Sequence, residues 1–185
     1  TGVSVMATMQ LYKNLTELTE ILKRIGGYKA KIEEYERLSD RIADGVRKYA
    51  VIEKDGEMRV LHGWGDDRAY TVGGFCDNDG LSRDSVTANA FFVLSGLIEK
   101  FPELKPHILA AYKRLDSKYG IKTFEPYFAP DNKEVGRITR LPKGTAENGA
   151  TYIHATLFAI WSLFETGEEE AAYEQIGKIL PLTHE

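Results

Sequence analysis

Apolar residues recur at helical spacing over the first part of the chain. Leucines and isoleucines from Leu11 to Ile25 follow one another at steps of three and four, which predicts a helix that ends at Gly26-Gly27. A second stripe of this kind runs from Ile32 to Tyr49. The glycine pair between the stripes predicts two antiparallel helices. A coiled coil is the alternative, but only about three heptads are available and the glycines interrupt them.

The pattern changes after Tyr49. Val51 and Ile52 precede Asp55-Gly56, and apolar residues resume between Met58 and Leu61. An Asp-Gly pair between two short apolar runs is a strong hairpin signal, because both residues tolerate a positive φ. We therefore expect a β-hairpin over residues 51–61.

Further helical patterns occupy residues 85–98, 102–120, 150–165 and 168–180. The first and the third are apolar almost all round, which predicts that both helices are buried. Asp84 or Ser85 can cap the first of them, and Pro102 and Pro106 suit the opening turn of the second. Three prolines interrupt residues 121–146, which predicts a long loop.

Six paired helices joined by long loops predict an all-α protein. A four-helix bundle has one apolar stripe per helix, so helices without a polar face favour part of an α/α toroid, here with a small β-hairpin. A chain of 185 residues with 43% hydrophobic content is long enough for one core, so we expect a single domain over residues 1–185. Because the sequence begins with Thr1, we expect it to be a piece of a longer protein.

Composition excludes several classes of partner. The formal net charge is -4 and no basic stripe appears, which argues against nucleic acid. Cys76 is the single cysteine, so the chain has neither an internal disulfide nor a cysteine-based zinc site, which fits a cytoplasmic protein. No apolar run reaches the ~18 residues of a membrane span, so no membrane partner is expected.

Candidate chemistry gathers in two stretches. Residues 63–68 read Gly-Trp-Gly-Asp-Asp-Arg, an acidic pair flanked by glycines and followed by an arginine. Residues 147–149 read Glu-Asn-Gly and lead into an apolar helix that carries His154. The alternatives are a simple turn in which Asp66 and Asp67 pair with Arg68, and a hydrogen-bonded core histidine.

Together these stretches resemble the inverting glycoside phosphorylases of the cellobiose and chitobiose phosphorylase type. That family carries a Gly-Asp-Trp-Asn-Asp motif and a Glu-Asn-Gly-Gly motif whose glutamate is followed seven residues later by a histidine. Glu147 and His154 keep that spacing. The acidic motif aligns on Asp67, with Trp64 displaced by one position, and Ala146 stands where the family has a lysine.

The resemblance implies the C-terminal half of a twelve-helix (α/α)₆ barrel of the six-hairpin type. It implies inverting phosphorolysis of a β-linked di- or oligosaccharide to a sugar 1-phosphate, with inorganic phosphate as co-substrate and neither a cofactor nor a metal. Asp67 would be the general acid and His154 would bind phosphate. The sugar-binding residues would be Glu147, Asp66, Trp64, Arg68 and Tyr152. The resemblance leaves a homodimer of the full-length enzyme open, and the isolated fragment is expected to be inactive.

Two other functions are compatible with these residues. An inverting hydrolase on the same fold would use Asp67 and Glu147 as its acid and base, because hydrolysis needs two carboxyl groups whereas phosphate is already an anion and needs no base. An inactive, helical carbohydrate-binding fragment is the third hypothesis. Tyr70 could add a sugar-stacking face, although such aromatics more often belong to a core. No role is assigned to His62.

Overall fold

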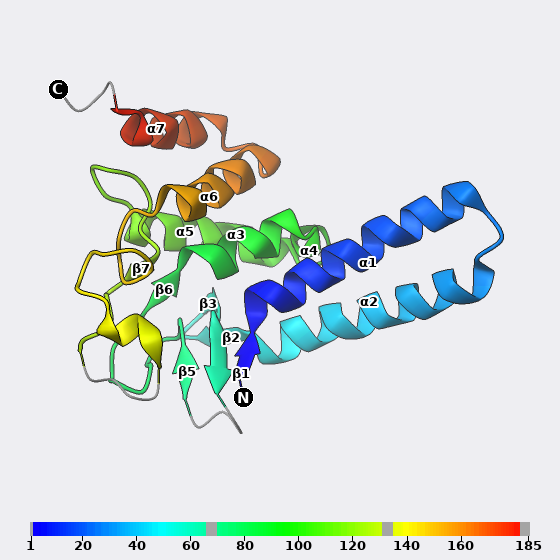
Figure 1. Cartoon of the computed structure of the whole chain (residues 1–185), viewed down its shortest axis with the longest axis horizontal. Coiled ribbons are helices and arrows are strands. Elements are labelled where there is room, and N and C mark those ends of the chain that lie inside the picture. Colours follow the sequence, from blue (N-terminus) through cyan, green and yellow to red (C-terminus); the bar gives the residue numbers. More distant parts are fainter. Residues whose placement is uncertain (1, 66–69, 131–134, 182–185) are drawn as a thin grey trace.

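The computed structural model describes residues 2–65, 70–130 and 135–181 (Figure 1). Its helices are α1 (Val5–Ile25), α2 (Lys29–Tyr49), α3 (Val86–Leu94), α4 (Leu97–Lys100), α5 (Lys105–Leu115), α6 (Ile153–Glu165) and α7 (Glu169–Ile179), with short 3₁₀ turns η2 (Pro102–Leu104) and η3 (Arg137–Arg140). Its strands are β1 (Gly2–Ser4), β2 (Val51–Lys54), β3 (Glu57–Val60), β4 (Gly63–Gly65), β5 (Thr71–Val72), β6 (Asp84–Ser85) and β7 (Phe124–Glu125). None of the helices in these ranges is long and apolar enough to cross a bilayer.

Helices α1 and α2 form a long antiparallel hairpin that projects from the body of the molecule (Figure 1). The pairing of the two helices is therefore confirmed. Helix α1 begins earlier than the apolar stripe suggested, because the Ser4 side chain accepts a 3.3 Å hydrogen bond from the Ala7 N–H and caps the helix. Gly26, at φ 78°, ends it in a conformation that suits glycine.

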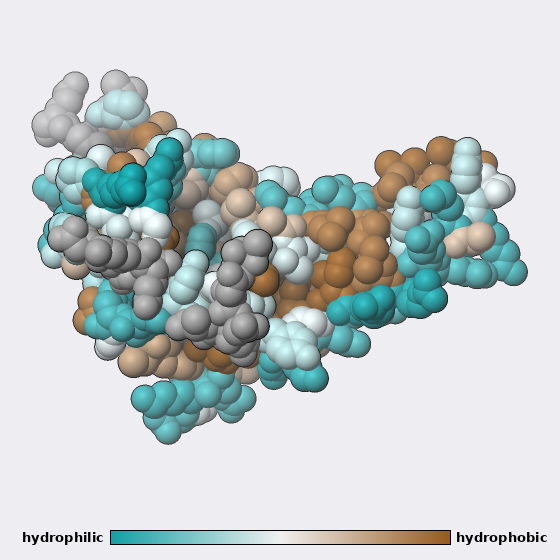
Figure 2. Space-filling view, turned by 60° about the horizontal axis from the view of Figure 1, so that its bottom comes forward, coloured by the Kyte–Doolittle hydropathy of each residue, from teal (hydrophilic) through white to brown (hydrophobic). Residues whose placement is uncertain are grey.

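The face of α1 that packs shares the buried Leu15 with the predicted stripe but otherwise differs from it. Val5, Met9 and Tyr12 are buried, whereas Leu11 and Ile25 of the predicted stripe are 47% and 65% exposed. The sequence of α1 carries apolar residues on two faces, and α3 packs against the first turns on the face of Met9. Apolar surface consequently remains visible along the projecting hairpin (Figure 2).

The hairpin β2–β3 is confirmed. Its strands pair antiparallel with Val51 opposite Val60, and the turn residues Asp55 and Gly56 both have positive φ, at 51° and 79°. This is the conformation that an Asp-Gly turn favours.

Two further small sheets were not expected, so the description as all-α with one hairpin is incomplete. Strand β4 pairs antiparallel with both β1 and β5, which fixes the start of the chain beside residues 63–72. Strands β6 and β7 pair with Asp84 opposite Glu125, which joins the start of α3 to the long loop 121–146. His62, directly before β4, and Phe124 of β7 line the candidate site described below.

Helix α3 is buried along almost its whole length, as predicted, but it is shorter than expected. Gly96 adopts a left-handed conformation at φ 85° and separates α3 from α4. Ser85 is the N-cap residue of α3, yet its side chain makes no capping bond. Asp84 pairs with Arg114 instead, at 2.6 Å.

The prediction that α6 is buried all round is wrong. Its buried side chains face α3 and α7, whereas Ile153, Leu157 and Trp161 are 53%, 47% and 51% exposed. The three exposed residues recur at steps of four and form one apolar stripe, here called the α6 stripe. Within the described ranges the helices do not close a ring, so the toroid stays a prediction.

Candidate functional site

One cavity of about 390 Å³ collects the candidate residues of the second stretch. Glu147, Tyr152 and His154 all line it, together with Arg137 and His62. The remaining lining residues are Met6, Thr87, Thr123, Phe124, Ile138, Leu141, Ala155 and Phe158. A carboxylate, a guanidinium and two imidazoles among apolar walls are typical of a small-molecule site.

Hydrogen bonds to the backbone hold the loop that carries Glu147. The fully buried Asn148 side chain accepts a 2.7 Å bond from the Phe128 N–H and donates to the carbonyls of Phe128 and Leu141 at 3.0 and 2.9 Å. The Thr123 hydroxyl donates a hydrogen bond to the Glu147 carbonyl at 2.8 Å and accepts one from the Gly149 N–H at 3.1 Å. The Glu147 side chain itself stays exposed at the cavity.

Gly149 is required where it stands. Its φ is 79°, and an added Cβ would lie 3.1 Å from the Cβ of Tyr127. The glycine of the Glu-Asn-Gly stretch therefore serves the local backbone, and a side chain there would displace the loop.

His154 lies in the first turn of α6 and is exposed at the cavity, so its interpretation as a buried core residue is wrong. Its ring packs against Phe158 with centroids 4.8 Å apart. The N-cap residue Tyr152 makes no side-chain capping bond, which leaves the first N–H groups of α6 available. The positive end of the helix dipole and these N–H groups favour an anion beside His154.

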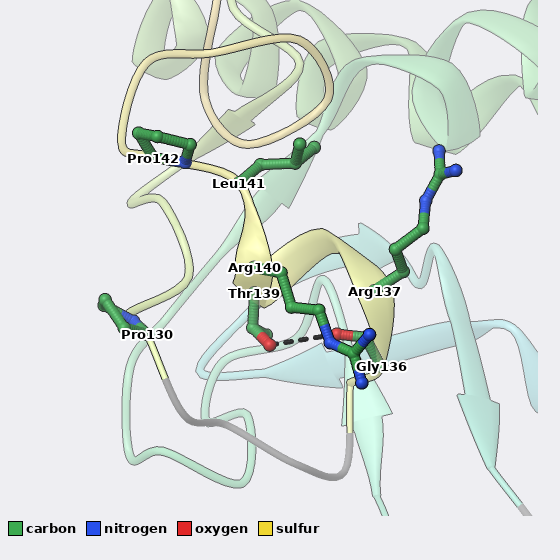
Figure 3. A pocket seen from close by; sticks show the side chains of 7 residues that line it. All are labelled: Pro130, Gly136, Arg137, Thr139, Arg140, Leu141 and Pro142. Atoms are coloured by element: carbon green, nitrogen blue, oxygen red, sulfur yellow. Dashed lines mark hydrogen bonds between the residues drawn. The ribbon is translucent and has the colours of Figure 1, made fainter.

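Arg137 is a candidate that the sequence did not reveal. It begins η3 and lines both this cavity and a wider neighbouring hollow of about 790 Å³, which also contains Arg140. Figure 3 shows the Arg137 and Arg140 side chains extending in different directions from this turn. Arg137 is exposed and forms no ion pair with another described residue, so its guanidinium can bind an anionic ligand.

His62 is the second residue that lay outside the sequence candidates. Its Nδ1 lies 2.9 Å from the Ser85 hydroxyl and 3.4 Å from the Thr87 hydroxyl, and its ring meets Phe124 edge-on at 4.9 Å. Burial lowers the pKa of His62 to about 4, so the imidazole is neutral near pH 7. No periodic pattern marks a single histidine between two short strands.

The first candidate stretch is only partly described. Asp66, Asp67 and Arg68 lie outside the described residues, so their convergence with His154 stays a prediction. Strand β4 leads from His62 at the cavity to Gly65, about 10 Å further along at ~3.3 Å per residue. Trp64 lies on this strand and borders two neighbouring hollows, one of them shared with Tyr70, but not the cavity of Glu147 and His154.

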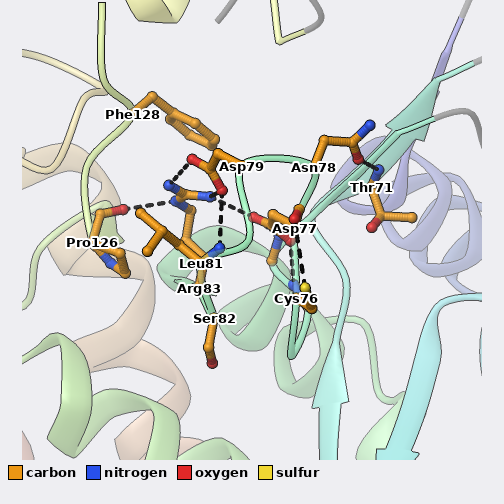
Figure 4. A network of polar contacts seen from close by, with 12 residues as sticks. Thr71, Cys76, Asp77, Asn78, Asp79, Leu81, Ser82, Arg83, Pro126 and Phe128 are labelled. Carbon is orange, nitrogen blue, oxygen red and sulfur yellow. Dashed lines mark hydrogen bonds and ion pairs between the residues drawn. The ribbon is translucent and has the colours of Figure 1, made fainter.

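A buried arginine joins residues 77–79 to residues 126–128 outside the cavity lining (Figure 4). Arg83 has no exposed surface, and it pairs with Asp77 and Asp79 at 2.7 Å each. Its Nε donates to the Pro126 carbonyl at 2.8 Å, and its guanidinium lies over the Phe128 ring at 4.0 Å. In this arrangement, here called the Arg83 cage, one buried guanidinium binds both the Asp77 and the Asp79 carboxylates.

Comparison with known proteins adds an independent finding. Residues 1–185 match the family model described as the catalytic domain of the glycosyl hydrolase 94 superfamily. The chain is 28% identical to solabiose phosphorylase from Paenibacillus borealis over 180 residues, which are 97% of this chain and 22% of that protein. It is 36% identical to cellobionic acid phosphorylase from Neurospora crassa over 106 residues, which are 56% of this chain and 13% of that protein.

A third relative is N,N'-diacetylchitobiose phosphorylase from Vibrio furnissii, 28% identical over 160 residues. The match covers 82% of this chain and 18% of that protein. The chain therefore spans less than a quarter of the length of each of these relatives.

Proposed function

Because the chain belongs to the glycosyl hydrolase 94 superfamily, we propose that the protein to which it contributes is an inverting glycoside phosphorylase. Its substrate would be a β-linked di- or oligosaccharide, and its product a sugar 1-phosphate. The observation that carries the proposal is that Glu147 and His154, seven residues apart, line one cavity together with Arg137. The phosphorylase names of the relatives support it.

In this reaction an oxygen of inorganic phosphate attacks the anomeric carbon from the face opposite the leaving sugar. The new C–O bond forms as the glycosidic C–O bond breaks, and a carboxylic acid gives its proton to the departing oxygen. The products are a sugar 1-phosphate of inverted anomeric configuration and the free acceptor sugar. One carboxylic acid is sufficient, because phosphate arrives already charged.

We assign the anion-binding part of the cavity to His154, Arg137 and the first turn of α6. A guanidinium and helix N–H groups both donate hydrogen bonds to phosphate oxygens, and charge-assisted bonds are the stronger kind. Glu147 can accept hydrogen bonds from two sugar hydroxyls, and the exposed Tyr152 ring can cover an apolar sugar face. The chain would thus supply a phosphate site and part of an acceptor site.

We assign the role of general acid to Asp67, and this assignment rests on the acidic motif of residues 63–68 alone. The chain as a whole would form the C-terminal half of an (α/α)₆ catalytic barrel, within relatives that are more than four times as long as the matched segment. In the full-length enzyme Asp67→Asn should lower turnover by ~10² to 10⁴-fold while sugar still binds, because the amide keeps the shape and lacks the transferable proton.

The decisive experiment measures sugar 1-phosphate release by the full-length enzyme from a panel of β-linked disaccharides, with and without phosphate. A phosphorylase needs phosphate for any cleavage. Cleavage at the same rate without phosphate would identify a hydrolase and overturn the proposal. Turnover retained by Asp67→Asn would instead assign the acid to another part of the catalytic domain and leave the phosphate result intact.

A further inference from the structure

His62 is a polar group at the cavity that the proposed reaction leaves unused. We infer that His62 positions the bound sugar by a hydrogen bond between its Nε2 and a sugar hydroxyl. The inference rests on the proposed function and adds to it a specificity residue for the neutral part of the substrate.

The backbone and one edge of the ring are already fixed. The His62 N–H donates to the Val72 carbonyl at 2.9 Å, and its carbonyl accepts from the Val5 N–H at 3.1 Å, so both neighbouring segments of the three-stranded sheet hold it. The hydroxyls of Ser85 and Thr87 occupy Nδ1. Among the described residues these two are the hydrogen-bond partners of the ring, which leaves Nε2 for a ligand in the cavity.

The chemistry of the surroundings selects a hydroxyl over phosphate. Ser85, Thr87 and Phe124 touch the ring and carry no charge, and burial keeps the imidazole neutral at pH 7. A neutral imidazole has one donor nitrogen and one acceptor nitrogen, and it offers no charge to an anion. A sugar hydroxyl both donates and accepts, so it can bind Nε2 in either tautomer.

Fixing the ring before the ligand arrives has an energetic consequence. A side chain that is already immobile loses little further rotamer entropy on binding, so most of its hydrogen bond contributes to affinity. Discrimination follows too, because a sugar that lacks the partner hydroxyl leaves a polar group at a desolvated wall without a partner.

The test compares His62→Phe and His62→Gln in the full-length enzyme. Phenylalanine keeps the ring shape and removes both nitrogens, whereas the amide of glutamine restores a hydrogen-bonding group near Nε2. His107→Ala is the matched control, because the His107 Nδ1 accepts from the Met58 N–H at 3.2 Å and lies outside the cavity lining. Thermal unfolding identifies variants that fold.

We expect His62→Phe to raise the KM for the disaccharide about 10-fold and to leave the KM for phosphate within about twofold. His62→Gln should recover part of the loss, and His107→Ala should show none. In the synthetic direction, wild type and His62→Phe should use one particular monodeoxy acceptor sugar equally well. The hydroxyl that this sugar lacks is the one that His62 binds. Calorimetric titration with the disaccharide should show the highest affinity for wild type, a lower one for His62→Gln and the lowest for His62→Phe. This measurement does not require phosphorolysis.

Unchanged sugar affinity in His62→Phe would overturn this inference and leave the phosphorylase proposal standing. A larger effect on the phosphate KM than on the sugar KM would overturn it as well. Sugar binding that depends on His62 in an enzyme that cleaves without phosphate would overturn only the proposed function. Wild-type enzyme that binds no sugar would overturn both.

Discussion

The side chains around the cavity divide into those that the fold uses and those that it leaves for a ligand. Asn148 and Thr123 direct their hydrogen bonds to backbone groups of the cavity wall. Glu147, His154 and Arg137 are exposed, and none of them forms an ion pair with a described residue. Substitutions at Asn148 or Thr123 should therefore lower the stability of the fold, whereas substitutions at the exposed cavity residues should lower ligand affinity.

His154→Ala should raise the KM for phosphate at least about 10-fold, because it removes a hydrogen bond to a charged ligand. The free energy of unfolding should change by less than about 0.5 kcal/mol, since the side chain is exposed. Initial rates against phosphate concentration and a denaturant titration measure the two effects. Asn148→Ala is the contrasting variant and should unfold more easily by about 1 to 3 kcal/mol. A His154 variant with unchanged phosphate dependence would show that its role is wrongly assigned.

His62 should make the chain lose stability in mild acid. Its folded pKa, about 4, lies below the unfolded value near 6.5, so between these values the unfolded state binds more protons than the folded state. Stability is therefore full above about pH 6.5 and falls as the pH drops toward 4. At pH 5 the loss should be about 2 kcal/mol.

Urea unfolding at pH 7 and pH 5 measures this loss. His62→Gln removes the titrating group and should reduce the difference between the two pH values by about that amount. An identical pH dependence in wild type and His62→Gln would mean that the histidine titrates normally in the folded protein.

At the scale of elements, the Arg83 cage connects the loop after β5 to the segment after β7. Asp77 also accepts hydrogen bonds from the N–H groups of Gly73 and Gly74. Arg83→Met should destabilise the chain by about 3 to 5 kcal/mol, because it leaves the buried Asp77 carboxylate without its counter-charge. The matched control is Arg47→Met, whose partner Glu103 is on the surface, with an expected cost below about 1 kcal/mol. Equal Tm values for the two variants would show that the cage is not stabilising.

The sequence predicts the helices better than the strands, for a physical reason. A helix of the length of α2 repeats its apolar spacing over five or more turns, whereas β4, β5 and β7 have two or three residues and no period to detect. Their pairings join segments far apart in the chain, which local patterns do not encode. Helix α1 is predicted, but it carries apolar residues on two faces, and the positions of α2 and α3 together decide which of them is buried.

The candidate site was predictable where its residues lie close together in sequence. Glu147 and His154 belong to one loop and the helix after it, so their spacing already brings them near each other. Arg137 comes from a turn in the long loop, and His62 from the end of a hairpin, so only the tertiary fold brings them to the same cavity. Short-range spacing carries no information of that kind.

At the scale of the whole molecule, the α6 stripe is exposed. Apolar residues of the projecting α1–α2 hairpin are exposed as well (Figure 2). Helix α6, which the sequence predicts to be buried on all sides, should therefore be covered by a surface outside these 185 residues. Large contiguous apolar patches on a protein surface usually mark an interface.

The isolated chain should consequently self-associate. Leu157→Glu places a charge in the α6 stripe and should shift the chain toward monomer at a cost to folding of less than about 0.5 kcal/mol, since Leu157 is already 47% exposed. Sedimentation velocity over a concentration series measures the shift. Glu169→Gln, an exposed change on α7, is the control. A wild-type chain that sediments as a monomer at every concentration would contradict the expectation.

The distribution of the cavity lining along the chain has a consequence for the order of folding. Its residues run from Met6 to Phe158, so closing the cavity requires contacts between segments up to about 150 residues apart. The α1–α2 hairpin needs only a turn between neighbours. Since loop closure costs more entropy for distant segments, helix formation should run ahead of cavity formation during synthesis and refolding. A nascent chain would then acquire most of its helical content well before its cavity closes.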